Sequence, residues 1–118
     1  MYNETILEHF KSPHNAGVLL DASAKAEVTN PVCGDVLLLS VRVEGGLIAA
    51  AQFKVQGCVA AIAAGSVLTD LLIGRTMGEA RRIEPQEIAD ALGGLPPATF
   101  HAAQLAAEAA AAVLKQVE

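Results

Sequence analysis

The sequence predicts an α+β domain in which a small antiparallel sheet of about three strands is covered by helices. Two apolar runs on either side of Gly45-Gly46 indicate a β-hairpin. Helical patterns follow the hairpin, and a long alanine-rich helix is predicted at the end of the chain. Strands that precede helices favour an antiparallel sheet packed against them. The 118 residues suit a single domain, residues 1–118.

The first helix is predicted over residues 2–10, because Ile6 and Phe10 fall on one face at helical spacing. Pro13, in a segment with further turn-forming residues, ends this helix. Residues 18–26 show no clear pattern, and an edge strand is the only regular element that we expect there.

The hairpin is predicted from a strand over residues 36–44 and a returning strand over residues 47–55. Side chains in a strand alternate between its two faces. One face of the first strand is strongly apolar and carries Leu37, Leu39, Val41 and Val43.

Four helices are predicted after the hairpin. A buried helix spans residues 59–73 and stops at Gly74. Thr76 and Glu79 have the spacing of a capping box, which opens a short helix. Pro85 opens the next helix from a position near its first turn. The last helix is expected over residues 98–117.

Composition excludes several classes of function. The net charge is −5 and the eight basic residues are scattered, so no nucleic-acid partner is expected. Residues 59–73 are the longest apolar run, too short to span a membrane. No secretory signal opens the chain, so a cytoplasmic protein is expected. The two cysteines are then metal ligands, reactive groups or plain buried thiols rather than a disulfide framework.

The residues that could carry chemistry lie at the ends of the predicted elements. Cys33 and Asp35 precede the first hairpin strand, and Cys58 follows the second. Because an antiparallel hairpin brings its open ends together, we expect these side chains to be neighbours. Cys33 and Asp35 should point the same way along an extended segment. His101, near the start of the last helix, can supply a fourth ligand.

The position of Cys58 directly before a long helix predicts a stabilised thiolate, because the helix dipole is positive there. His9 and His14 are interpreted as structural or exposed, since nothing brings them to the hairpin. Taken alone, His101 would be a surface histidine and Asp35 a turn residue. No orienting third group or oxyanion motif accompanies Cys58 and His101, so hydrolytic catalysis ranks low.

Several motifs resemble those of the IscU/NifU-type scaffold family of iron–sulfur cluster assembly, in the right order along nearly the whole chain. They are Tyr2 to His9 with Pro13, Asn15 and Gly17; Asn30-Pro31-Val32-Cys33-Gly34-Asp35; Phe53 to Gly57-Cys58; and Leu92-Gly93-Gly94-Leu95-Pro96-Pro97 with His101 and Leu105-Ala106. The resemblance implies a SufE/NifU-like α+β fold with a long C-terminal helix. It also implies a non-enzymatic scaffold that receives sulfur from a cysteine desulfurase and builds a transient [2Fe–2S] cluster.

Carried over from the family, Cys33, Asp35 and Cys58 are ligand positions and His101 is the adjacent histidine. Ala102 stands where the family has a third cysteine, and Thr99 replaces an expected lysine. The resemblance therefore implies an altered ligand set. Cluster-accepting apoproteins and chaperones are further implied partners, and Thr99 weakens the case for the chaperone. A monomer or weak homodimer is expected.

Two other functions remain open at this point. The chain could bind zinc through the same four residues and modulate, or accept sulfur from, the desulfurase, since zinc accepts mixed sulfur, nitrogen and oxygen ligands. It could also be a metal-free interaction module of the same pathway. Ala102 favours the module over a cluster scaffold, whereas the joint presence of Cys33, Asp35, Cys58 and His101 favours a metal or cluster site.

Overall fold

The computed structural model describes residues 2–117, which form three strands and six helical segments. In chain order these are α1 (Glu4–Lys11), β1 (Ala24–Thr29), β2 (Val36–Glu44), β3 (Leu47–Gln56), α2 (Val59–Leu72), α3 (Met77–Ala80), α4 (Pro85–Ala91), the 3-10 turn η1 (Pro97–Thr99) and α5 (His101–Gln116). The expected α+β class, with a three-stranded antiparallel sheet and a long C-terminal helix, is confirmed.

The sheet has the order β1-β2-β3, and both strand pairs are antiparallel. The predicted hairpin is present: β2 and β3 turn at Gly45-Gly46, and Val36 at the open end pairs with Gln56. The apolar face of β2 is buried as its alternation predicted, and Leu37, Leu39 and Val41 have no exposed surface. The edge strand expected within residues 18–26 is displaced along the chain: β1 begins at Ala24 and extends to Thr29, so it overlaps only the end of that segment.

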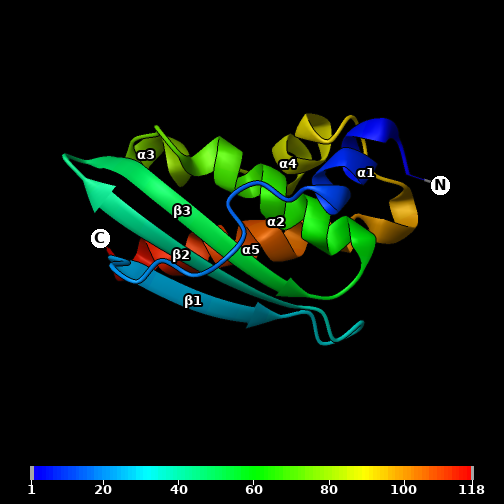
Figure 1. The fold of residues 1–118 in the computed structure, drawn as a ribbon, viewed down its shortest axis with the longest axis horizontal. Helices are drawn as coiled ribbons and strands as arrows, with labels where there is room; N and C mark the ends of the chain where they lie inside the picture. Colours follow the sequence, from blue (N-terminus) through cyan, green and yellow to red (C-terminus); the bar gives the residue numbers. More distant parts are fainter. Residues whose placement is uncertain (1, 118) are drawn as a thin grey trace.

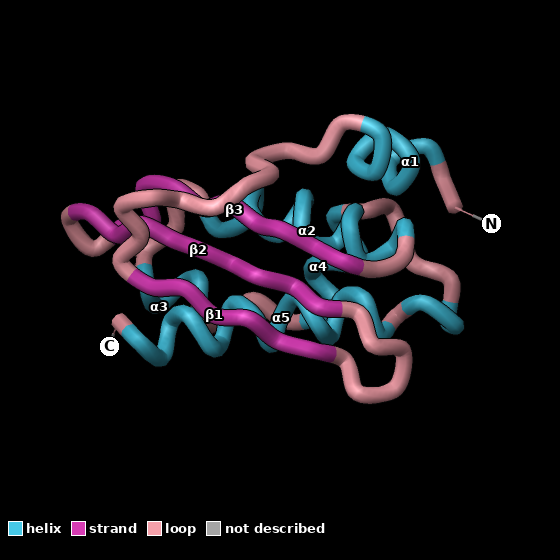
Figure 2. The backbone as a smooth tube through the Cα atoms, turned by 60° about the horizontal axis from the view of Figure 1, so that its bottom comes forward, coloured by secondary structure: helices cyan, strands magenta, loops and turns pink. Residues whose placement is uncertain are grey.

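The two long helices pack on the same face of the sheet. Helix α2 packs on β3, and α5 packs on β1 and β2 (Figures 1 and 2). Helix α2 is buried along most of its length because it lies between the sheet, α1, α4 and α5. Its small residues permit these close contacts: Gly65 faces Phe53 of β3, where an added Cβ would lie 2.5 Å from the ring.

The N-terminal segment ties α1 to the rest of the fold. Helix α1 packs on α2, and the chain then crosses to the free edge of β3 (Figure 1). There Ala16 forms a parallel bridge with Phe53, and the Gly17 N–H donates to the Phe53 carbonyl at 2.8 Å. This bridge covers part of an otherwise exposed sheet edge.

The predicted helix boundaries are close to the observed ones. The capping box of Thr76 and Glu79 is present, and Pro85 opens α4. The last helix differs, because η1 precedes it and α5 begins only at His101. Within residues 2–117 no helix combines the length and the apolar content needed to cross a membrane.

Candidate functional site

The loop between β1 and β2 is organised by Asn30. Its side-chain oxygen accepts the backbone N–H groups of Val32 at 2.9 Å and Cys33 at 3.3 Å. Its backbone N–H donates to the Asp35 carbonyl at 2.8 Å. An asparagine that bonds ahead to the backbone in this way sets a tight turn. Cys33 therefore lies in a turn, and the expectation of an extended segment from Cys33 to Asp35 is wrong.

The Asp35 carboxylate is largely buried, although it lies at the end of the molecule where the hairpin opens. Only 7% of the surface of Asp35 is exposed to solvent. The space that it occupies exists because residue 57 is glycine: a Cβ on Gly57 would lie 2.6 Å from the Asp35 Cγ. Gly57 follows the last residue of β3, where a glycine commonly ends a strand. Its second role, to leave room for a carboxylate, depends on a contact between two segments.

Cys58, which follows β3 and is the N-cap of α2, contacts the same carboxylate. Its thiol lies 3.3 Å from Asp35 Oδ2 and can donate a hydrogen bond to it. Among residues 2–117 this thiol is the side-chain hydrogen-bond partner found for the Asp35 carboxylate. A buried carboxylate normally has a cation or several donors beside it. The hairpin thus delivers Asp35 and Cys58 to one place, as expected from antiparallel geometry.

His101 and Cys33 complete the cluster. Ligand atoms of Cys33, Asp35 and His101 all lie within 4.8 Å of one another. His101 is the first residue of α5 and is half-buried, whereas Cys33 is exposed. Cys58 is not part of this mutual group of three, and it joins the others through Asp35. The structure therefore brings all four predicted residues to one end of the sheet, from three separate segments.

The pKa of Cys58 differs from the prediction. Burial raises the pKa of its thiol, and the neighbouring Asp35 raises it further. The backbone N–H groups of Ala61 and Ala60, at the start of α2, lower the pKa as the helix dipole predicts. Burial and Asp35 together outweigh them, so the expectation that the position before the helix favours the thiolate is wrong. A cation beside the sulfur would be needed to favour the charged form.

The two departures from the family pattern lie beside this cluster. Ala102 follows His101 in the first turn of α5 and has no exposed surface. Thr99 lies in η1, where its hydroxyl donates to the Pro96 carbonyl at 3.0 Å. The third thiol of the family pattern would thus occupy a buried position on α5.

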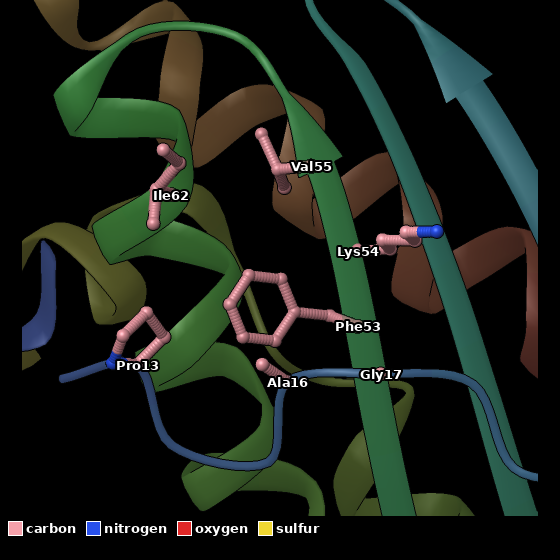
Figure 3. A pocket seen from close by; sticks show the side chains of 7 residues that line it. All are labelled: Pro13, Ala16, Gly17, Phe53, Lys54, Val55 and Ile62. Carbon is pink, nitrogen blue, oxygen red and sulfur yellow. The ribbon is translucent and has the colours of Figure 1, made fainter.

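A separate hollow of about 420 Å³ lies between the N-terminal segment, β3 and α2 (Figure 3). It is mainly apolar. Its lining residues are Pro13, Ala16, Gly17, Phe53, Lys54, Val55 and Ile62. It contains no cysteine, histidine or carboxylate, so it has no donor set for a metal ion.

The known sequences that resemble this chain agree with the family suggested by its motifs. The model of the family described as "NifU-like N terminal domain" matches residues 1–118. The iron-sulfur cluster assembly scaffold protein IscU of Azotobacter vinelandii is 39% identical over 119 residues, which cover 97% of this chain and 91% of the relative. The protein with the same description in Aquifex aeolicus is 40% identical over 109 residues, covering 91% of this chain and 69% of the relative.

Comparison with solved structures identifies the same fold. An N-terminal NifU-like protein from Brucella abortus has a TM-score of 0.77 at 22% identity, covering 98% of this chain and 92% of that chain. A putative scaffold for the SUF system from Fervidobacterium islandicum also has a TM-score of 0.77 at 22% identity, covering 96% of both chains. At this identity the likeness concerns the fold alone.

Proposed function

The chain belongs to the family of NifU-like N-terminal domains, and from this premise we propose that it is a scaffold or carrier for iron–sulfur cluster assembly. Its cargo is iron and a transient [2Fe–2S] cluster, held by Cys33, Asp35, Cys58 and His101. The observation that carries the proposal is the meeting of these four side chains at the open end of one hairpin. No catalytic role is assigned to any of them.

The donor chemistry fits this cargo. Thiolates are the usual ligands of iron–sulfur clusters, and imidazole and carboxylate also bind iron. The buried Asp35 carboxylate has a thiol rather than a cation as its side-chain partner, which leaves it short of positive charge. Bound iron would supply that charge and would favour the Cys58 thiolate.

The four side chains differ in how far they are buried and in how firmly their neighbours hold them. Asp35 and Cys58 are buried or half-buried and mutually oriented, whereas Cys33 lies on an exposed turn. An exposed thiol beside a fixed pair suits a site that must admit and release its cargo. Ala102 leaves two thiolates where the family pattern has three, and the histidine makes the ligand set less negative by one charge. Histidine ligation raises cluster potentials, so a bound cluster should be easier to reduce than one held by three thiolates.

Anaerobic reconstitution with iron(II), cysteine, a cysteine desulfurase and excess dithiothreitol, which reduces the persulfide sulfur to sulfide, tests the proposal. We expect a visible chromophore in the wild-type chain and its loss in Cys58→Ser. His101→Ala should weaken or shift the chromophore, and Gln104→Ala, one turn along α5 on an exposed position, is the matched control. A colourless wild-type chain after reconstitution would refute cluster assembly.

Zinc binding is the second candidate, and one observation favours it. Two thiols, one imidazole and one carboxylate make a four-ligand set that zinc accepts in a tetrahedron. Metal analysis of the freshly purified chain separates the two functions. One equivalent of zinc that is lost in His101→Ala would support a zinc-binding modulator or sulfur acceptor of the desulfurase.

The direct partner that we propose is a cysteine desulfurase, since the scaffold needs a source of sulfur. Cluster-accepting apoproteins are the second class, and Thr99 argues against the dedicated chaperone. Desulfurase binding that is undiminished by Cys33→Ser and Cys58→Ser, in a chain that holds no metal, would instead indicate an interaction module.

A further inference from the structure

A second group of metal-binding side chains lies between α1, the following loop and α2. Ring nitrogens of His9 and His14 and a carboxylate oxygen of Asp70 all lie within 4.8 Å of one another. His9 comes from the last turn of α1, His14 from the loop, and Asp70 from the end of α2. The two imidazole rings pack with their centroids 4.6 Å apart.

Each of the three side chains is already oriented by a neighbour. His9 Nδ1 lies 2.7 Å from the buried Ser66 hydroxyl, and that hydroxyl also accepts the backbone N–H of His14 at 2.8 Å. Asp70 contacts His14 Nδ1 with one oxygen at 2.6 Å and the amide of Asn15 with the other at 3.4 Å. Hydrogen bonds to one ring nitrogen are what orient histidine ligands in metal sites.

We propose that His9, His14 and Asp70 form a second metal site, which binds a divalent transition-metal ion of the zinc or iron(II) type. Two imidazoles and one carboxylate are a known ligand set for both ions, with further positions left to water. The ion would join α1 and its loop to α2, three segments that otherwise meet through packing and hydrogen bonds.

The rearrangement that binding requires is small. Ligand atoms about 2.0–2.2 Å from one ion lie roughly 3–3.5 Å from each other, compared with separations of up to 4.8 Å here. The His14 and Asp70 side chains are 50% and 41% exposed, so they can move without disturbing the core. Their direct ion pair must open, and exposed pairs of this kind contribute only about 0–1 kcal/mol.

This site shares no residue with the hairpin cluster of Cys33, Asp35, Cys58 and His101. Cys58 caps the beginning of α2, whereas Ser66 and Asp70 lie 8 and 12 residues further along the chain. At about 1.5 Å per helical residue, the separation along the helix axis is roughly 12–18 Å. Metal binding at the second site is therefore independent of the proposed scaffold function, and each can be tested without the other.

The alternative is that His14 and Asp70 form only an ion pair, and one substitution separates the two cases. His14→Arg keeps a side chain that can donate a hydrogen bond to Asp70 but removes the imidazole ligand. His14 is exposed, so this variant should fold normally, and circular dichroism checks that it does. Asp70→Asn is a second variant that removes the charged oxygen ligand.

The measurement is a titration with Zn²⁺ and Co²⁺ of the full chain carrying Cys33→Ser, Cys58→Ser and His101→Ala, which eliminate the hairpin cluster. We expect about one equivalent of Zn²⁺ to remain bound, and its affinity to fall at least about tenfold in the added His14→Arg or Asp70→Asn variants. The Co²⁺ complex should show the visible d–d absorption of a protein-bound ion, and the added His14→Arg or Asp70→Asn should remove it. No bound Zn²⁺ in the background variant, or binding that His14→Arg leaves unchanged, would overturn the proposal.

Discussion

Substitution of Gly57 by alanine tests the central contact of the hairpin cluster. The backbone of Gly57 is not in the left-handed region, so alanine can adopt it without strain. The added Cβ would lie 2.6 Å from Asp35 Cγ and 3.0 Å from its Cβ. Restoring an ordinary carbon–carbon contact of about 3.5 Å displaces the carboxylate by roughly 0.9 Å.

That displacement exceeds what a metal site tolerates, because ligand distances must hold to within about 0.2 Å. We therefore expect Gly57→Ala to lower zinc affinity about 10- to 100-fold, or roughly 1.4–2.8 kcal/mol. The free energy of unfolding should change by less than about 1 kcal/mol, since the steric effect is offset by the lower entropy of the unfolded alanine chain.

Competition with a chromophoric chelator measures the zinc affinity in chains that also carry His14→Arg, which removes a ligand of the second proposed metal site, and chemical denaturation measures the free energy of unfolding. Gly78→Ala is the matched control, because its Cβ would meet only the Thr76 hydroxyl at 4.0 Å and its backbone is also unstrained. In an Asp35→Ala background Gly57→Ala should have little further effect, since the carboxylate that it displaces is gone. Equal zinc affinities for Gly57→Ala and Gly78→Ala would refute the reasoning.

Two further predictions concern the attachment of α1 to α2. Ser66→Ala leaves the His9 ring and the His14 backbone N–H without their buried partner. We therefore expect the free energy of unfolding, measured with denaturant, to fall by about 2–4 kcal/mol. A decrease below about 1 kcal/mol would contradict this. Burial, and then the charge of His14, lower the pKa of His9, so the unfolded chain binds more protons than the folded chain just below the ordinary histidine pKa. In a chelating buffer, stability should therefore fall as the pH drops through about 6.5, and His9→Gln should flatten that part of the profile.

The hairpin and its site could be predicted because their signals are local. Alternation over residues 36–44 and the Gly45-Gly46 turn determine the strand pairing, and antiparallel pairing then places Asp35 beside Cys58. The role of Asn30 also had a signal, because an Asn-Pro pair favours turn initiation. The same pair also permits an extended conformation, so it does not decide between a turn and the extended segment expected from Cys33 to Asp35.

Other features depend on packing between segments that are distant in the sequence. His9, His14 and Asp70 meet only because α1 docks on the end of α2, and no local pattern reports that contact. The space beside Gly57 likewise depends on where another segment places its carboxylate. The raised pKa of Cys58 was missed for the same reason, since its position before a helix is visible in the sequence and its burial is not.

The raised pKa of Cys58 affects how the four side chains at the open end of the hairpin bind a metal ion. Because burial and Asp35 raise the pKa of this thiol, a metal ion that binds the sulfur must displace a proton. Zinc affinity should then rise with pH, by up to about tenfold per unit for each proton released. Calorimetry in buffers of different ionisation enthalpy counts these protons in chains that carry His14→Arg, which removes a ligand of the second proposed metal site. There Cys58→Ser should release about one proton fewer per zinc than the chain that keeps Cys58. Equal proton release by the two chains would mean that Cys58 is not a ligand, and the hairpin cluster would then hold its ion through Cys33, Asp35 and His101 alone.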